Sequence, residues 1–79
     1  MAKVLLFGRL GDLAGWRERD MQLPDRLSAL RDALLASAPE LAPIAAAEIR
    51  VAVDGQLVRG DAPLEEAREV AFLPPFSGG

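Results

Sequence analysis

The sequence predicts a single α+β domain in which one main helix packs across a mixed sheet of four or five strands. Leucines recur at helical spacing between positions 27 and 35, which indicates an amphipathic helix. Apolar residues alternate with others from 49 to 53 and lead into an Asp-Gly pair, which is typical of a strand entering a hairpin. Short apolar runs at 3–7 and 69–73 add a first and a last strand. The last strand can lie parallel to the first only through the long connection between them.

Chain length limits the organisation to one small domain. A chain of 79 residues has a modest core and no linker long enough to separate domains. We therefore expect a globular unit over residues 1–73 and an extended C-terminal tail over 74–79.

The first expected strand spans Lys3–Phe7. Alternation places Val4 and Leu6 on one face of the sheet and Leu5 and Phe7 on the other. Both faces are thus apolar, and a domain this small has little material for a third layer. Phe7 is therefore a candidate partner-contact residue, the alternative being burial in the core.

Residues 9–14 predict a single helical turn, which Gly15 ends. Trp16, the only tryptophan, is interpreted as a partly buried cover on the loop that follows. Met21–Leu23 are expected to form a second strand that pairs with the first.

The main helix is expected to begin after Pro24, with Asp25 as its N-cap. Its apolar stripe is interpreted as core, and it must end before Pro39 because the residue before a proline disfavours helical dihedrals. The stripe consists of Leu27, Leu30 and Leu34, with Leu35 beside it. The side of the helix that faces solvent is expected to carry Arg26, Arg31 and Asp32.

Residues 40–48 predict either a loop or a loop with one helical turn. A half-buried strand from Ile49 to Val53 then meets Asp54-Gly55, the strongest hairpin signal in the chain. Gln56–Arg59 would return as the next strand, with Leu57 on the side that faces a partner.

A turn-rich passage from 60 to 68, with a short helical turn at 64–67, precedes the final strand, Glu69–Leu73. This strand is expected to direct Val70 and Phe72 inward and Leu73 outward.

The tail carries the clearest functional signal. Pro74 and Pro75 fix their φ angles and favour an extended, polyproline-like course away from the sheet. Gly78 and Gly79 lack Cβ atoms, so another protein's backbone can close around them and reach the terminal carboxylate. The tail residues, Pro74, Pro75, Phe76, Ser77, Gly78 and Gly79, therefore resemble a stalk that presents one carboxyl group, the alternative being an ordinary frayed end.

Composition excludes several functional classes. The chain has no cysteine and no histidine, which excludes a Cys/His zinc site, a thiol nucleophile and a Ser-His-Asp triad. A net charge of −3 argues against nucleic acid as a main partner. No run predicts a transmembrane helix or a signal peptide, so no membrane association and a cytoplasmic location are expected.

The order of elements and the run from Glu69 to Gly79 resemble the small subunit of molybdopterin synthase, a ubiquitin-like β-grasp sulfur carrier of the MoaD/ThiS superfamily. The diglycine is shared by all ubiquitin-like carriers, whereas the Val-Ala-Phe-Leu-Pro-Pro-Phe-Ser-Gly-Gly run is more specific. The resemblance also covers Lys3–Phe7, the stop at Gly15 and the hairpin after Val53.

The resemblance implies that an adenylating enzyme uses ATP to activate the Gly79 carboxylate, with Gly78 giving clearance. A persulfide on another protein would then supply the sulfur of a C-terminal thiocarboxylate. The tail would insert into the large synthase subunit and donate sulfur to cyclic pyranopterin monophosphate, in a complex that is a heterotetramer in the family. The carrier would hold no cofactor or metal and would not be catalytic on its own. The implied interface residues are Phe7, Leu57, Leu73 and Phe76.

Two departures from the family pattern are expected to alter a surface loop and a turn. Gly11 stands where family members often carry arginine, and Glu66-Ala67-Arg68 replaces an Asp-Gly-Asp turn. Three other readings compete with the resemblance: a thiazole-synthesis sulfur carrier, a protein modifier joined to lysines through Gly79, and a passive β-grasp binding module.

Overall fold

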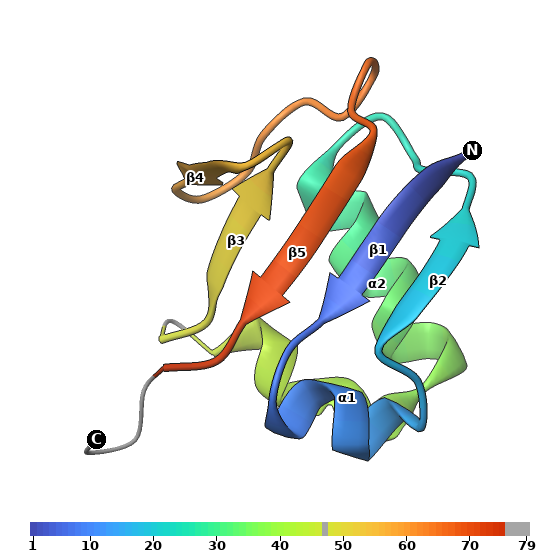
Figure 1. Ribbon diagram of the computed structural model, residues 1–79, viewed down its shortest axis with the longest axis vertical. Helices are drawn as coiled ribbons and strands as arrows, with labels where there is room; N and C mark the ends of the chain where they lie inside the picture. Colours follow the sequence, from blue (N-terminus) through green and yellow to red (C-terminus); the bar gives the residue numbers. More distant parts are fainter. Residues whose placement is uncertain (47, 76–79) are drawn as a thin grey trace.

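The centre of the fold is a mixed five-stranded sheet with strand order β2-β1-β5-β3-β4 (Figure 1). A computed structural model of the chain describes residues 1–46 and 48–75. The predicted α+β architecture is confirmed. The strands are β1 (Ala2–Leu6), β2 (Glu18–Met21), β3 (Arg50–Val53), β4 (Gln56–Val58) and β5 (Glu69–Leu73).

Strand β5 lies in the middle of the sheet, parallel to β1 and antiparallel to β3. Its register places Phe72 between Leu6 of β1 and Val51 of β3. Val70 and Phe72 are fully buried, as predicted, because every second residue of a strand points to the same face. The strand that carries the tail is therefore hydrogen-bonded on both sides.

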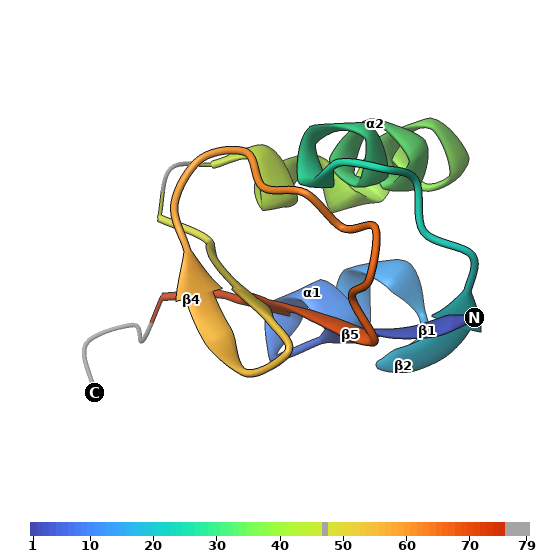
Figure 2. The same cartoon turned by 90° about the horizontal axis from the view of Figure 1, so that it is seen from above.

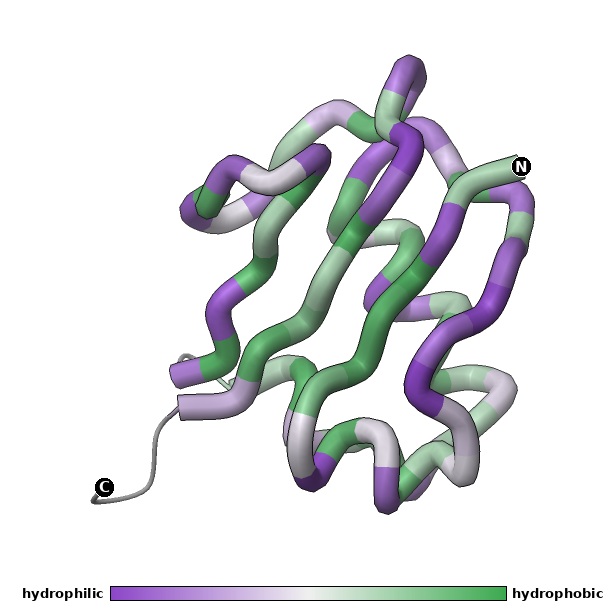
Figure 3. Tube along the Cα trace, viewed as in Figure 1, coloured by the Kyte–Doolittle hydropathy of each residue, from purple (hydrophilic) through white to green (hydrophobic). Residues whose placement is uncertain are grey.

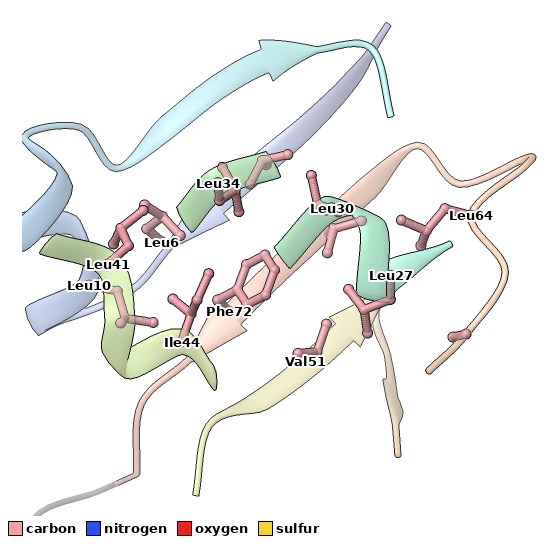
Figure 4. Close-up of a cluster of buried hydrophobic side chains, with 13 residues drawn as sticks. Leu6, Leu10, Leu27, Leu30, Leu34, Leu41, Ile44, Val51, Leu64 and Phe72 are labelled. Atoms are coloured by element: carbon pink, nitrogen blue, oxygen red, sulfur yellow. The ribbon is translucent and has the colours of Figure 1, made fainter. Parts of the chain in front are cut away.

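Two helical segments cover one face of the sheet and enclose the core (Figure 2). They are α2 (Leu27–Ser37) and the 3-10 helix η1 (Pro39–Ala45). Of the two alternatives for residues 40–48, the structure therefore shows the one with a helical turn, over residues 40–45. The predicted stripe of Leu27, Leu30 and Leu34 is buried, and the helix ends before Pro39 as expected. The Phe72 ring lies amid the core cluster, beneath side chains from these helices (Figure 4).

The short helix α1 (Arg9–Ala14) ends at Gly15, which adopts a left-handed conformation with φ of 83°. This confirms the predicted turn and its stop. The expectation that Gly11 lies in a surface loop is wrong, because Gly11 is a buried position of α1. A Cβ there would lie 2.8 Å from Arg17 Cγ and 3.0 Å from the carbonyl oxygen of Leu6.

The second strand pairs antiparallel with β1 as predicted, but it begins earlier in the chain. It spans Glu18–Met21 instead of 21–23. Three of its four residues are charged, as suits an edge strand, because charged side chains on an edge discourage pairing with other chains. Lys3 of β1 pairs with Glu18 at 3.3 Å, and the Arg19 guanidinium lies 4.5 Å from the centre of the half-buried Trp16 ring.

The expected N-cap of the main helix is also wrong. Asp25 is not the cap, and the residue before α2 is Arg26, whose side chain makes no capping hydrogen bond. The Asp61 carboxylate, distant in sequence, accepts the Ser28 backbone N–H at 2.8 Å and the Arg26 Nε–H at 2.6 Å. A residue from a distant loop thus replaces a local cap.

The Asp54-Gly55 hairpin is confirmed. Both residues have positive φ, 50° and 83°, as a type I′ turn requires. The returning strand β4 ends at Val58, one residue earlier than expected. In the passage from 60 to 68, the Ala67 N–H donates to the Leu64 carbonyl at 3.1 Å and closes a single turn.

Candidate functional site

The end of β5 is where the candidate site begins. Parallel strands β1 and β5 run toward the same edge of the sheet, where β1 enters α1 and β5 continues toward the tail (Figure 1). The Phe7 N–H donates to the Phe72 carbonyl at 3.1 Å and extends the pairing past the end of β1. We call Pro74 and Pro75 the tail root; Pro74 is half-buried and Pro75 is exposed.

Gly8 forms the surface against which the tail root lies. Its φ of 56° and ψ of −132° are accessible to glycine and disfavoured for other L-residues. A Cβ built on Gly8 would lie 3.1 Å from Pro74 Cγ and 3.9 Å from Pro74 Cδ. The turn between β1 and α1 is therefore in close contact with the first tail proline.

An apolar groove of about 610 Å³ lies beside this contact. Its walls come from the turn after β1, from α1, from η1 and the loop that follows it, and from the end of β5 with the tail root. Arg9 and Glu48 are its charged members. The principal apolar lining residues are Phe7, Leu10, Leu13, Ile49, Leu73 and Pro74.

The face of the sheet opposite α2 is left uncovered by the described elements (Figure 2). Strand register aligns a row of small and apolar residues across it, Leu5, Ala71, Ala52 and Leu57. Hydropathic colouring follows the same pattern, with apolar stretches along β1, β5 and β3 and a polar β2 (Figure 3). The predicted second apolar face is thus present.

The predicted interface residues fall into two places. Phe7 is 45% exposed, and it lines the groove together with the half-buried Leu73. Leu57 is 61% exposed on β4, two strands from β5 and so about 10 Å away across the sheet. The structure therefore brings Phe7 and Leu73 together and leaves Leu57 on the far part of the same sheet.

Leu57 lines a second hollow together with three arginines, Arg31, Arg50 and Arg59. Arg31 was expected on the solvent side of the helix, but it is half-buried. Its Nε atom is buried with no hydrogen-bond partner among residues 1–46 and 48–75. The arginines come from a helix, a strand and a loop, so no local sequence pattern indicates that they meet.

Sequence reasoning read Gly8 only as the end of the first strand and did not identify its contact with Pro74. The available signal was weak: a glycine directly after an apolar run is equally typical of any strand end. The remaining predicted site residues, Phe76, Ser77, Gly78 and Gly79, lie outside the described residues.

Arg26 and Asp61, whose pKa values are shifted, stabilise the fold and lie outside the candidate site. The hydrogen bond from Arg26, followed by that from the Ser28 backbone, holds the pKa of Asp61 well below its usual range. The same hydrogen bond raises the pKa of Arg26. None of the bonds that Asp61 makes involves β5 or the tail root.

Two structural features are absent from the described part of the chain. Residues 1–46 and 48–75 contain no group of three or more Asp, Glu, His or Cys placed to hold a metal ion. None of the helices within these residues is long and apolar enough to cross a bilayer.

Comparisons with known proteins place the chain in a family. A model of the ThiS family matches residues 4–79. SAMP1 from Haloferax volcanii has the same fold, with a TM-score of 0.82, 24% identity and coverage of 99% of this chain and 98% of that one. A Pyrococcus furiosus protein provisionally described as molybdopterin converting factor, subunit 1, gives a TM-score of 0.76 and 26% identity, over 94% of this chain and 95% of that one. A search of curated proteins found no match. The sheet order, the helix across the sheet and the likeness to these structures show a ubiquitin-like β-grasp fold. Because the family model matches nearly the whole length of the chain, the chain belongs to the ThiS family.

Proposed function

We propose that this protein is the sulfur carrier subunit of a molybdopterin synthase and that it carries sulfur on Gly79. The main support for the proposal is the way in which β5 leads into the tail root. A central strand with buried Val70 and Phe72 leads directly into Pro74 and Pro75 and toward a diglycine. The ThiS family match and the likeness to the Pyrococcus furiosus protein support the same conclusion.

The proposed chemistry begins with activation of a poor acyl donor. The Gly79 carboxylate attacks the α-phosphate of ATP on an adenylating enzyme, pyrophosphate leaves, and a glycyl-adenylate forms. The terminal sulfur of a protein persulfide attacks the acyl carbon and AMP leaves, which joins carrier and donor through an acyl disulfide. A donor thiol then attacks the donor's sulfur, forms a disulfide with it and releases the Gly79 thiocarboxylate.

The thiocarboxylate is the nucleophile in the last stage. Inside the large synthase subunit its sulfur is passed to cyclic pyranopterin monophosphate, and water restores the Gly79 carboxylate. A carrier of this kind needs no thiol of its own, which suits a chain without cysteine. General acid and base groups come from the large subunit, which suits a chain without histidine.

The partners follow from this sequence of steps. They are the adenylating enzyme, which uses ATP, the persulfide donor and the large synthase subunit. The uncovered sheet face and the groove beside the tail root are the surfaces proposed to contact them. On these surfaces Phe7, Leu57 and Leu73 are the apolar contact residues, and Phe76 continues the apolar character into the tail.

Three alternatives share the fold and differ in the fate of Gly79. A thiazole-synthesis carrier would form the same thiocarboxylate and deliver it elsewhere, a protein modifier would form an amide with lysines, and a passive module would not react. Polymeric chains of the ubiquitin kind are disfavoured because Lys3, the only lysine, lies in β1 and pairs with Glu18. This pairing leaves single attachment to other proteins open to test.

The deciding experiment is an intact-mass measurement after incubation with ATP, an adenylating enzyme and a persulfide donor. We expect a rise equal to the exchange of one oxygen for sulfur, localised to Gly79 by fragmentation. Adding the large subunit and cyclic pyranopterin monophosphate should return the carrier to its original mass and yield molybdopterin. Formation of covalent conjugates with other proteins would support the modifier alternative instead. An unchanged mass, with the enzyme and donor active on another carrier, would contradict the proposal.

A further inference from the structure

The contact between Gly8 and Pro74 joins two residues that are distant in sequence and that meet at the base of the tail, just past the paired ends of β1 and β5. Gly8 lies between β1 and α1, and its φ of 56° belongs to the region that favours glycine. Pro74 directly follows Leu73, the last residue of β5. A side chain at position 8 would begin 3.1 Å from Pro74 Cγ, which is closer than an unstrained carbon–carbon contact of about 3.5–4.0 Å.

We propose that Gly8 is a positioning residue for the tail: by leaving room for the Pro74 ring, it sets the direction in which Gly79 is presented to the adenylating enzyme. This inference rests on the proposed carrier function. It assigns to the turn between β1 and α1 a role in sulfur loading, in addition to its role in the fold.

Both partners of the Gly8–Pro74 contact are held rigidly, so the contact can set the direction of the tail. On one side, β5 is paired with two neighbouring strands, and the Phe7 N–H to Phe72 carbonyl bond of 3.1 Å holds the β1 and β5 ends together. On the other, the Pro74 ring cannot rotate away from position 8 as an open side chain would, because it is closed onto its own backbone. A Cβ at position 8 would therefore require Pro74 Cγ to shift by a few tenths of an ångström, through a change of ring pucker or a movement of the backbone.

A displacement of Pro74 changes the point from which the five residues that follow it begin, and Gly79 is the last of them. Misplacing a reacting group by about 1 Å can cost about a hundredfold in rate.

The other glycines with positive φ provide a matched control. Gly15, at the opposite end of the same helix α1, has φ of 83°, and a Cβ there would meet nothing within 4 Å. Gly8→Ala and Gly15→Ala therefore both strain the backbone beside α1, and only Gly8→Ala crowds the tail root. Gly8, with ψ of −132°, lies outside the left-handed region that Gly15 occupies with ψ of 11°, so the two alanines strain the backbone unequally. Only the part of the kinetic difference that Pro74→Ala abolishes therefore reports the crowding.

The test is a pair of double-mutant cycles that use Gly8→Ala with Pro74→Ala and with Pro75→Ala. Sulfur loading is followed by intact mass across carrier concentrations, with ATP, an adenylating enzyme and a persulfide donor. We expect Gly8→Ala to lower kcat by about tenfold to a hundredfold and to change KM for the carrier less, because the change is confined to the tail root and leaves the uncovered sheet face unaltered. In the Pro74→Ala background, which lacks the ring, Gly8→Ala should have little further effect on kcat, whereas with Pro75→Ala it should retain its full effect.

Additive effects in both cycles, or an equal loss of kcat in Gly15→Ala, would overturn the inference, because the loss would then come from weakened folding. If Gly8→Ala does not fold, Pro74→Ala is compared with Pro75→Ala. A larger loss of kcat for Pro74→Ala is expected, and equal losses would contradict the role of the contact.

A crystal structure of the Gly8→Ala protein separates this inference from the proposed function. We expect residues 69–73 to superpose on the wild-type strand and Pro74 to move away from position 8. If wild-type protein gains no sulfur, the carrier function fails, and this displacement still tests whether Gly8 directs the tail. An unmoved Pro74 would refute the inference even if sulfur loading is confirmed.

Discussion

The Asp61 carboxylate connects the loop before β5 to the first turn of α2. It accepts hydrogen bonds from the Arg26 side chain and from the backbone N–H groups of Ser28 and Ala62, at 2.6, 2.8 and 2.9 Å. Each bond favours the ionised carboxylate, which is why the pKa of Asp61 is lowered. A group whose pKa is lower in the folded state stabilises the fold where it is ionised.

This arrangement predicts a pH-dependent effect of Asp61→Asn. The stabilisation is fully present above the pKa of an unfolded aspartate, about 3.9, and is lost as pH falls through the lower pKa of the folded state. The difference in unfolding midpoint between wild type and Asp61→Asn should therefore be constant from about pH 5 to 7 and should shrink below about pH 4. Thermal unfolding over this pH range measures it.

Asp25→Asn is the matched control, since Asp25 is an exposed aspartate beside the same helix end whose side chain makes none of the capping bonds. It should leave the midpoint nearly unchanged at every pH. A loss for Asp25→Asn as large as that for Asp61→Asn would show that the local residue is the cap after all.

Asp54 has two functions in the hairpin, and its substitution should separate them. It adopts φ of 50°, and its Oδ1 accepts the backbone N–H groups of Arg68 and Glu69 at 2.8 and 3.0 Å. Asp54→Ala loses both bonds and strains the left-handed position, so we expect a loss of about 2 kcal/mol in the free energy of unfolding. Asp54→Asn keeps an oxygen acceptor and tolerates this conformation, so its loss should be clearly smaller. Chemical denaturation compares the two, and equal losses would contradict the role of Oδ1.

Elements with strong periodicity were predictable from sequence, and those defined by distant partners were not. The stripe of α2, the Asp54-Gly55 turn and the full extent of β5 follow from local patterns. The start of β2 and the cap of α2 do not, because pairing with β1 and the Asp61 loop determine them. A polar edge strand has no hydrophobic period to detect.

The main helix provides a test of the predicted core. Leu30 is buried and Leu35 is half-buried on α2. Leu30→Ala should cost about 2–5 kcal/mol in the free energy of unfolding, because it removes buried methyl groups and leaves a cavity. Leu35→Ala has the same helix propensity change and should cost clearly less. Urea titrations of both variants measure the difference, and similar losses would show that the stripe does not define the core.

The candidate site was predictable in composition but not in arrangement. Strand alternation predicted Leu57 and Leu73 off the main core, and the structure decides the open alternative for Phe7 by leaving it 45% exposed. Their division between the groove and the β4 side of the sheet depends on the strand order β5-β3-β4, which no local pattern specifies. The Gly8–Pro74 contact likewise requires the parallel pairing of β1 and β5.

The uncovered sheet face predicts a binding defect for Leu57→Asp. Leu57 is 61% exposed, so a charge there should leave the unfolding midpoint nearly unchanged. At an apolar contact with the large synthase subunit, the buried charge should weaken binding by about tenfold or more. Gln56→Asp, a neighbouring change on the opposite face of β4, is the control. Titration calorimetry measures both, and unchanged affinity for Leu57→Asp would exclude this part of the face from the interface.

The fold as a whole separates stability from chemistry. Core packing, the Asp61 cap and the hairpin support a sheet whose central strand ends at the tail root, and the shifted ionisable pair lies among the supporting groups. The proposed reacting group is a backbone carboxylate, which requires no catalytic side chain. What the fold must supply is a rigid base and a defined direction for the tail.

This division predicts that one residue added after Gly79 abolishes sulfur loading without disturbing the fold. The extension would convert the Gly79 carboxylate into an amide and move the new carboxylate beyond the position that the tail root sets. We expect no gain of sulfur by intact mass, with an unfolding midpoint equal to that of the wild type, because the tail lies beyond β5. An alanine added before Met1, which is 92% exposed at the other end of the parallel β1–β5 pair, is the control and should leave loading intact. Loading of the extended chain, with the extra residue shown by mass to be retained, would mean that Gly79 is not the sulfur-carrying residue.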